Sequence, residues 1–178
     1  NRIHFPQSLQ IELTSCCNLK CIMCPRTVGT NRSEPDRKMN REVLDYLVTS
    51  VIPYVQRIDI VGDGEPLLEQ ELLFHLMESA EIFKIPVTIC SNGVLLTKEV
   101  SKKLIELNLE DINISLDAAN AETYKKIRGA DFEKVVQNIE ALDQIKQKEN
   151  RSTPHIHLSM VAMKDNIEEL PELINLAR

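Results

Sequence analysis

Three cysteines stand close together near the start of the sequence, at Cys17, Cys21 and Cys24, in a C-x3-C-x2-C spacing. Clustered thiolates are soft ligands that select zinc, copper(I) or an iron–sulfur cluster. Zinc usually takes four ligands from C-x2-C pairs or Cys/His sets, and this stretch has neither a second pair nor a nearby His. Three cysteines can instead hold three irons of a [4Fe–4S] cluster and leave the fourth iron open. An open iron indicates chemistry, because electron-transfer clusters normally have four residue ligands.

The two remaining cysteines bear on the number of ligands. Cys16 is adjacent to Cys17 but falls outside the spacing, so we expect it to be a neighbour and not a ligand. Cys90 lies in a strand-like run, and we expect it to be a buried small hydrophobe. A four-ligand electron-transfer protein would need one of these two as its fourth ligand. A zinc-binding scaffold without catalysis is the other alternative, and the cysteine pattern leaves both open.

The segments that must position the cysteines alternate between strand-like and helix-like. Apolar and polar residues predict five strands, at 9–14, 57–61, 86–90, 111–116 and 155–162. Helical spacing of apolar residues follows the strands, and Asn40 and Thr97 are placed to cap two of the helices. Residues 31–37 are polar and contain Pro35, so we expect them to be irregular. Repeated β–α units of this kind predict an α/β fold with a parallel sheet and helices outside it.

Unusual residues fall just beyond the ends of the predicted strands. They are Cys17, Gly64, Asn92, Asp117 and Met163. A doubly wound sheet and a barrel both fit the alternation of strands and helices. Active sites of β/α barrels are built at the carboxyl ends of several different strands. This placement therefore favours a barrel with one composite site.

Several short motifs resemble those of one enzyme family, the radical S-adenosylmethionine (radical SAM) enzymes. The cysteine spacing is the signature of that family. Gly62-Asp63-Gly64-Glu65-Pro66 is similar to its Gly-Gly-Glu-Pro motif, with Asp63 in place of a glycine, and Ser115-Leu116-Asp117 is similar to its Ser-Leu-Asp segment. The resemblance implies a partial (β/α)6, TIM-like barrel. We therefore expect residues 1–178 to be one radical SAM core domain that is C-terminally incomplete, with the sixth unit missing. The run from Cys17 to Arg26 looks most like members that carry a C-terminal SPASM or twitch domain.

The resemblance also implies how the cofactors are held. Cys17, Cys21 and Cys24 would ligate the [4Fe–4S] cluster, whose unique iron is chelated by SAM. Gly64 and Glu65 would bind the methionine amino group, although Asp-Gly is also a common turn pair. Ser115 and Asp117 end a predicted strand, and the serine would contact the methionine carboxylate. Arg128 would grip that carboxylate with its bidentate fork.

Three further positions are expected near the adenosine part of SAM. Asn92 follows the third predicted strand, and ribose contact and turn geometry are equally good explanations for it. The backbone of Met23 would face the adenine while its side chain packs. Met163 ends the segment 161–163, which matches the hydrophobic wall near adenine, although core packing explains this segment equally well.

The implied reaction begins when a flavodoxin- or ferredoxin-type donor delivers one electron to the cluster. The reduced cluster then cleaves the C5′–S bond of SAM, and the resulting 5′-deoxyadenosyl radical abstracts hydrogen from the substrate. The protein orients SAM and excludes water, while the cofactor supplies the radical. The substrate is expected to be a small polar metabolite, a natural-product precursor or a peptide, and the sequence does not choose among them.

Composition bounds the partners and the compartment. The chain has 178 residues and a net charge of −6, from 21 Lys and Arg against 27 Asp and Glu. An acidic balance without a basic block argues against nucleic acid and against anionic membrane surfaces. No apolar run approaches the roughly 20 residues that span a bilayer. Five cysteines, an odd number with three in one motif, do not suggest a disulfide framework, so we expect a reducing cytoplasm.

Overall fold

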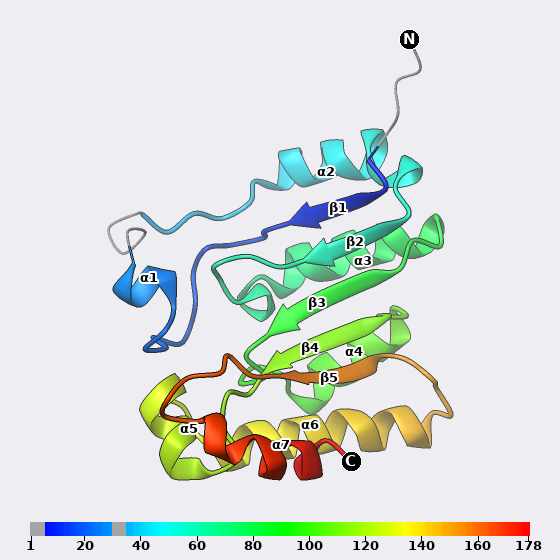
Figure 1. Ribbon diagram of the computed structural model, residues 1–178. Coiled ribbons are helices and arrows are strands. Elements are labelled where there is room, and N and C mark those ends of the chain that lie inside the picture. The colour runs from blue at the N-terminus through cyan, green and yellow to red at the C-terminus, as the bar shows by residue number, and fades with distance from the viewer. Residues whose placement is uncertain (1–5, 30–34) are drawn as a thin grey trace.

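Five parallel strands form one sheet whose spatial order follows the sequence, β1-β2-β3-β4-β5, in the computed structural model. The structure describes residues 6–29 and 35–178. All five arrowheads in Figure 1 point to the same side, so the carboxyl ends of the strands share one edge. The α/β prediction with a parallel sheet is confirmed. The strands are β1 (Ser8–Ile11), β2 (Arg57–Ile60), β3 (Val87–Ser91), β4 (Asp111–Ser115) and β5 (His155–Ser159).

Helices connect successive strands and supply the other half of the core. In Figure 1, α3 and α4 lie behind the sheet, while the short helix α1 lies beyond the carboxyl end of β1. The α-helices are α1 (Pro25–Val28), α2 (Arg41–Ser50), α3 (Gln70–Ile82), α4 (Lys98–Glu106), α5 (Ala121–Arg128), α6 (Phe132–Lys148) and α7 (Leu170–Leu176). The described residues also include short 3-10 helices at η2 (Ile52–Tyr54), η3 (Pro66–Leu68) and η4 (Ile167–Glu169).

The sheet has two unlike faces because side chains alternate along each strand. Ile58, Ile60 and Ile89 are among the fully buried residues that join the helices in the core. Thr88 and Cys90 on β3 occupy the alternate positions and are half-buried. The sheet is therefore packed by helices on its apolar face and lined by more polar side chains on the other.

Helix caps form where the sequence places them. The Asn40 side chain accepts a hydrogen bond from the N–H of Glu42 at 2.7 Å, and Thr97 accepts one from Val100 at 3.3 Å. Both side chains satisfy an N–H group that the first turn of a helix leaves without a backbone partner. The two predicted caps are confirmed.

Two strands end more than one residue before their predicted ends. Strand β1 ends at Ile11 instead of residue 14, because beyond it Leu13 and Thr14 pair with the segment at Lys38–Met39 and not with β2. Strand β5 ends at Ser159 instead of residue 162, because the N–H of Val161 donates to the Asp117 carboxylate. Of the segment predicted to be irregular, residues 31–34 lie outside the described residues, and 35–37 form neither helix nor strand.

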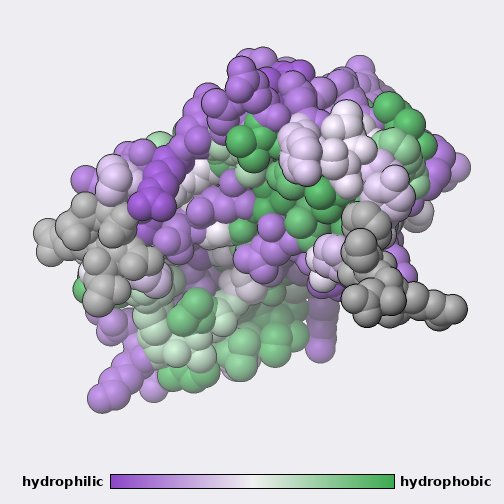
Figure 2. Space-filling model, turned by 90° about the horizontal axis from the view of Figure 1, so that it is seen from above, coloured by the Kyte–Doolittle hydropathy of each residue, from purple (hydrophilic) through white to green (hydrophobic). Residues whose placement is uncertain are grey.

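The sheet is open at β1 and β5, each of which pairs with one neighbouring strand within the described part of the chain. Viewed from above, on the side of α2, hydrophilic and hydrophobic side chains are interspersed on the surface (Figure 2). Val43 and Tyr46 on α2 are among the exposed apolar residues. In residues 6–29 and 35–178, no helix has both the length and the apolar character needed to cross a bilayer.

Candidate active site

The cysteine loop runs from the end of β1 to α1 and is tied down at both sides. The N–H of Ile22 donates to the carbonyl of Ile127 at the end of α5, at 3.0 Å. The carbonyl of Cys16 accepts the N–H of Glu65 at 2.8 Å. Cys24 accepts from the first turn of α1, which begins at Pro25, a residue suited to the first helical position. Cys21 is buried, Cys24 is half-buried and Cys17 is exposed.

A cavity of about 420 Å³ opens beside this loop, at the carboxyl edge of the sheet. Its walls come from the carboxyl ends of β3 and β4 and from segments that follow each of the five strands, including the end of α5 after β4. Its lining includes the three motif cysteines, together with Met23, Gly64, Glu65, Cys90, Asn92, Ser115, Arg128 and Val161. A volume in this range is typical of sites for small ligands.

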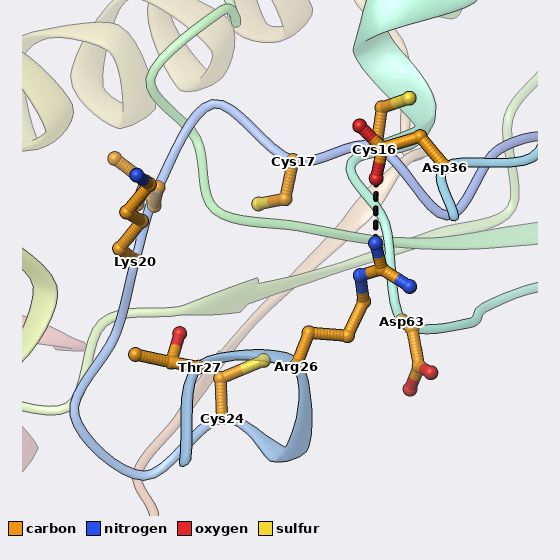
Figure 3. Close-up of a pocket in the computed structure, with 9 residues that line it drawn as sticks. Cys16, Cys17, Lys20, Cys24, Arg26, Thr27, Asp36 and Asp63 are labelled. Carbon is orange, nitrogen blue, oxygen red and sulfur yellow. Dashed lines mark hydrogen bonds and ion pairs between the residues drawn. The ribbon is translucent and has the colours of Figure 1, made fainter. Parts of the chain in front are cut away.

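A second hollow, of about 370 Å³, lies on the other side of the cysteine loop (Figure 3). Cys17 and Cys24 line both hollows, so the loop forms a wall between them. Arg26 extends from α1 to Asp36, with its Nη2 at 2.5 Å from Oδ1 of that carboxylate. This ion pair joins α1 to the segment that leads back toward α2.

The glycine-containing loop after β2 packs directly on the cysteine loop. A Cβ atom added at Gly64 would overlap the carbonyl oxygen of Thr14 and lie 2.6 Å from that of Cys16. The N–H of Asp63 donates to the carboxylate of Glu12 at 2.5 Å. Only a residue without a side chain permits this approach of two backbones.

Glu65 is buried, with 2% of its surface exposed, and its carboxylate is extensively bonded. Oε1 accepts from the hydroxyl of Ser91 at 2.8 Å and from the N–H of Leu67 at 3.2 Å, while Oε2 accepts from the N–H of Asn92 at 2.7 Å. Burial raises the pKa of Glu65, and these hydrogen bonds oppose that rise. The carboxylate thus clamps the loop after β2 to the end of β3.

Two side chains donate N–H groups to cysteine sulfurs. Nδ2 of Asn92 lies 3.8 Å from Sγ of Cys17 and 2.8 Å from Oδ1 of Asn18. Nη1 of Arg128 lies 3.5 Å from Sγ of Cys21. Burial raises the pKa of the Cys21 thiol, and the Arg128 guanidinium opposes this rise. Burial likewise raises the pKa of the Cys17 thiol.

The arginine belongs to a buried ion pair. Asp117 is 1% exposed and binds Nε of Arg128 at 2.6 Å. Burial lowers the pKa of Arg128, but the charge and hydrogen bond of Asp117, together with the nearby Cys21 and Tyr124, outweigh this effect, and the net pKa is raised. Asp117 itself is not part of the cavity lining, and neither is Met163. The other predicted cofactor residues all reach the cavity wall.

Comparison with known proteins identifies the family. The model of the Radical SAM superfamily matches residues 11–177. This chain belongs to the radical SAM superfamily. Members of the superfamily use a [4Fe–4S] cluster and SAM, so the predicted cofactors are confirmed. The zinc-binding and four-ligand electron-transfer alternatives are not favoured by this match.

Similar radical SAM proteins are longer than this chain. A probable GTP 3′,8-cyclase of Methanocaldococcus jannaschii is 32% identical over 175 residues, which cover 97% of this chain and 55% of that protein. Mycofactocin maturase MftC of Mycolicibacterium smegmatis is 31% identical over 174 residues, which cover 97% of this chain and 42% of that protein. The chain thus spans about half the length of the curated relatives it matches.

Solved radical SAM structures share the fold. SuiB of Streptococcus suis bound to S-adenosylmethionine superposes with a TM-score of 0.77 at 20% identity, over 97% of this chain and 38% of that one. The protein anSMEcpe with bound AdoMet superposes with a TM-score of 0.76 at 25% identity, over 96% of this chain and 48% of that one. The predicted partial barrel is confirmed, as an open arrangement of five strands.

The residues present fit the radical SAM cofactors. Three thiols line one wall of a single cavity, and Asn92 and Arg128 direct N–H groups at two of the sulfurs. Among the described residues, no three His, Cys, Asp or Glu side chains converge closely enough to hold one metal ion. A cluster spreads its ligands over several irons, so thiols that share a wall without meeting at a point suit it.

The structure corrects one expectation and adds residues that the sequence did not single out. Cys90 is not buried; it is half-buried and lines the cavity, because alternate side chains of β3 point away from the helices. Its Sγ lies 3.7 Å from Oγ of Ser115. Glu12 and Asn18 contact the site loops through Asp63 and Asn92. In the sequence, Glu12 could have been noticed as a polar residue in the alternating pattern of the first predicted strand.

Proposed function

We propose that this chain is the catalytic core of a radical SAM enzyme, with Cys17, Cys21 and Cys24 as the cluster ligands. The observation that carries the proposal is the common cavity, which gathers these cysteines with residues from the ends of β2, β3 and β4. Cys16 lines only the second hollow among the pockets described, which supports its exclusion from the ligand set. When bound and reduced, the cluster supplies the electron that cleaves SAM to a hydrogen-abstracting radical.

The chain's own residues bind and orient SAM in this proposal. Arg128 and Ser115 hold the methionine carboxylate. The guanidinium of Arg128 supplies positive charge and the N–H groups that are not bonded to Asp117. The backbone around Gly64 accepts from the methionine ammonium. Glu65 contributes mainly by fixing that backbone, because its carboxylate already accepts three hydrogen bonds.

The remaining predicted residues form the adenosine side of the proposed site. Asn92 and Met23 line the cavity together with the cysteines, and in the proposed site the backbone of Met23 faces the adenine. Val161 lines it as the apolar wall, and Met163 supports the turn in which Val161 lies. Asp117 lies behind the cavity wall, where its carboxylate binds Arg128.

The substrate class and the electron donor are part of the proposal. We expect the substrate to be a small polar metabolite, a natural-product precursor or a peptide, and Ser115 and Cys90 of the sheet face the cavity that would receive it. Relatives include a GTP 3′,8-cyclase and SuiB crystallised with its precursor peptide SuiA, so the fold accepts ligands of both kinds. A flavodoxin- or ferredoxin-type protein would supply the electron.

Serine variants of all five cysteines test the ligand assignment. Each variant is reconstituted anaerobically with iron and sulfide, and iron per chain and 5′-deoxyadenosine formed under dithionite are measured. We expect Cys17→Ser, Cys21→Ser and Cys24→Ser to lose most iron and all SAM cleavage, because each removes one of three ligands. Cys16→Ser is the matched control and should retain both.

The same series contains the outcomes that contradict the proposal. Loss of the cluster in Cys16→Ser with retention in Cys17→Ser would show that the ligand register is wrong. Loss of iron in Cys90→Ser would indicate a fourth protein ligand, since Cys90 lines the same cavity. The cluster would then lack an open iron, and the radical mechanism would fail.

A further inference from the structure

Arg128 is fixed on the cavity wall by an unusual residue at the end of β4. Asp117 has a backbone φ of 60°, in the left-handed region that residues other than glycine rarely adopt. Its backbone N–H and that of Leu116 both donate to the carbonyl of Ser159, and its own carbonyl accepts from Nδ2 of Asn166 at 2.8 Å. The surrounding hydrogen bonds therefore hold a conformation that is unfavourable by itself.

This conformation directs the Asp117 carboxylate to two partners at once. Oδ2 accepts from Arg128 through Nε at 2.6 Å and Nη2 at 2.5 Å. Oδ1 accepts the N–H of Val161 at 2.6 Å. Both Arg128 and Val161 line the cavity, whereas Asp117 does not. The carboxylate thus joins two cavity walls from behind.

The orientation of the guanidinium follows from this contact. With one edge against Asp117, Arg128 turns Nη1 toward the sulfur of Cys21, at 3.5 Å. A guanidinium carries five N–H donors, so others remain for a ligand in the cavity. Without the carboxylate, the arginine would keep its charge but lose this fixed direction.

We propose that Asp117 is a positioning residue, which acts on SAM and on the cluster through Arg128, while its other carboxylate oxygen holds the N–H of Val161, a contact that the side-chain oxygen of an asparagine can keep. This inference rests on the proposed function, in which Arg128 binds the SAM carboxylate and Cys21 ligates the cluster. It predicts that Asp117 matters for SAM affinity although it makes no contact with SAM. It also predicts an effect on the cluster, because N–H donors to cluster sulfurs influence the reduction potential.

The test compares reconstituted wild-type protein with Asp117→Asn, Arg128→Gln and the double variant. Asparagine has the same shape as aspartate and tolerates the left-handed conformation, so the backbone is retained. Asp165→Asn is the matched control. Asp165 forms an exposed ion pair, at 2.9 Å, with Lys126 of α5, the helix that also carries Arg128. Iron per chain, the dissociation constant for SAM and the midpoint potential of the cluster are measured anaerobically.

We expect Asp117→Asn to keep its iron while SAM binding weakens by about tenfold, the loss expected for one misdirected charge-assisted contact. Arg128→Gln should weaken SAM binding at least as much. The double variant should match Arg128→Gln, because residues that act in series are not additive. Arg128→Gln should shift the midpoint potential to more negative values, because it removes a positive charge and an N–H donor beside the sulfur of Cys21. Asp165→Asn should leave all three measurements unchanged.

Three results would overturn the proposal. The first is wild-type SAM affinity in Asp117→Asn. The second is a double variant that binds SAM more weakly than Arg128→Gln by the full factor that Asp117→Asn causes alone. That result would indicate that Asp117 contacts SAM independently of Arg128. The third concerns folding: if Asp117→Asn loses iron, the neutral double variant should regain it, because no uncompensated guanidinium stays buried. Failure of the double variant to regain iron would assign Asp117 to the fold alone. A wild-type holoprotein that does not bind SAM would instead refute the proposed function.

Discussion

Replacement of Gly64 by alanine tests how the two site loops meet. An added Cβ would overlap the carbonyl oxygen of Thr14 and lie 2.6 Å from that of Cys16. Both obstacles are backbone atoms, so they cannot rotate away as a side chain can. The loops must therefore separate, which also weakens the hydrogen bond from the N–H of Glu65 to the carbonyl of Cys16.

The loss of stability in Gly64→Ala follows from the steric overlap and from the weakened hydrogen bond. Overpacking costs about 1–3 kcal/mol, and a lost hydrogen bond adds about 0.5–1.5 kcal/mol. We therefore expect Gly64→Ala to lower the free energy of unfolding by about 3 kcal/mol, which for a domain of this size is a fall in Tm of roughly 6–12 °C. Because the displaced segment leads directly into Cys17, iron uptake should also fall.

Gly62→Ala provides the matched control. The three atoms nearest to its Cβ would all belong to the side chain of Glu12, including Cγ at 2.6 Å, and that exposed side chain can rotate away. The cost is then the hydrogen bond from Asp63 to Glu12, about 1 kcal/mol. Thermal unfolding and iron per chain after reconstitution separate the two variants. Equal Tm values, or full iron uptake by Gly64→Ala, would refute the steric reasoning.

Two further predictions concern buried polar groups. The hydroxyl of Tyr124 is buried and has no hydrogen-bond partner among the described residues, so Tyr124→Phe should leave stability unchanged or raise it by up to about 1 kcal/mol in urea unfolding. A clear loss of stability would reveal a partner for the hydroxyl. Nδ2 of Asn138 donates to the carbonyls of Gly93, at 2.9 Å, and Val94, at 3.2 Å, so Asn138→Ala should cost about 1–3 kcal/mol. An unchanged unfolding midpoint for Asn138→Ala would contradict this pairing.

The fold was predictable because its signals are local and repeated. Each β–α unit carries its own alternation of apolar residues, and the caps at Asn40 and Thr97 depend on neighbours within a few positions. The ends of β1 and β5 were not predictable in this way. Alternation reports which face of a segment is buried, and Leu13 stays buried after β1 has ended, by pairing with the loop at Met39.

The sequence was sufficient to predict many of the residues that line the candidate site, but not which hydrogen-bond partners those residues have. The motif residues that line the cavity sit at strand ends, and parallel strands bring such ends together. The clamp made by Glu65 and the bond from Asn92 toward Cys17 join residues from different units. No local pattern encodes such pairings. For the same reason, the exposure of Cys90 depends on which face of β3 the helices cover, and the sequence around it is compatible with either face.

The consecutive strand order has a consequence for biosynthesis. The chain is synthesised from its N-terminus, at about 5–20 residues per second, and a domain generally folds as a unit. The cysteines therefore emerge early, in the first β–α unit, while the groups that anchor their loop come from later units. Glu65 anchors Cys16 from the second unit, Asn92 reaches Cys17 from the third, and Ile127 and Arg128 reach the loop from the helix after β4. During synthesis, the loop that carries the thiols lacks part of its support until more than two thirds of these residues have left the ribosome. Insertion of the cluster into a finished pocket is consequently a late event, and early exposure of the thiols makes their oxidation a hazard of slow translation.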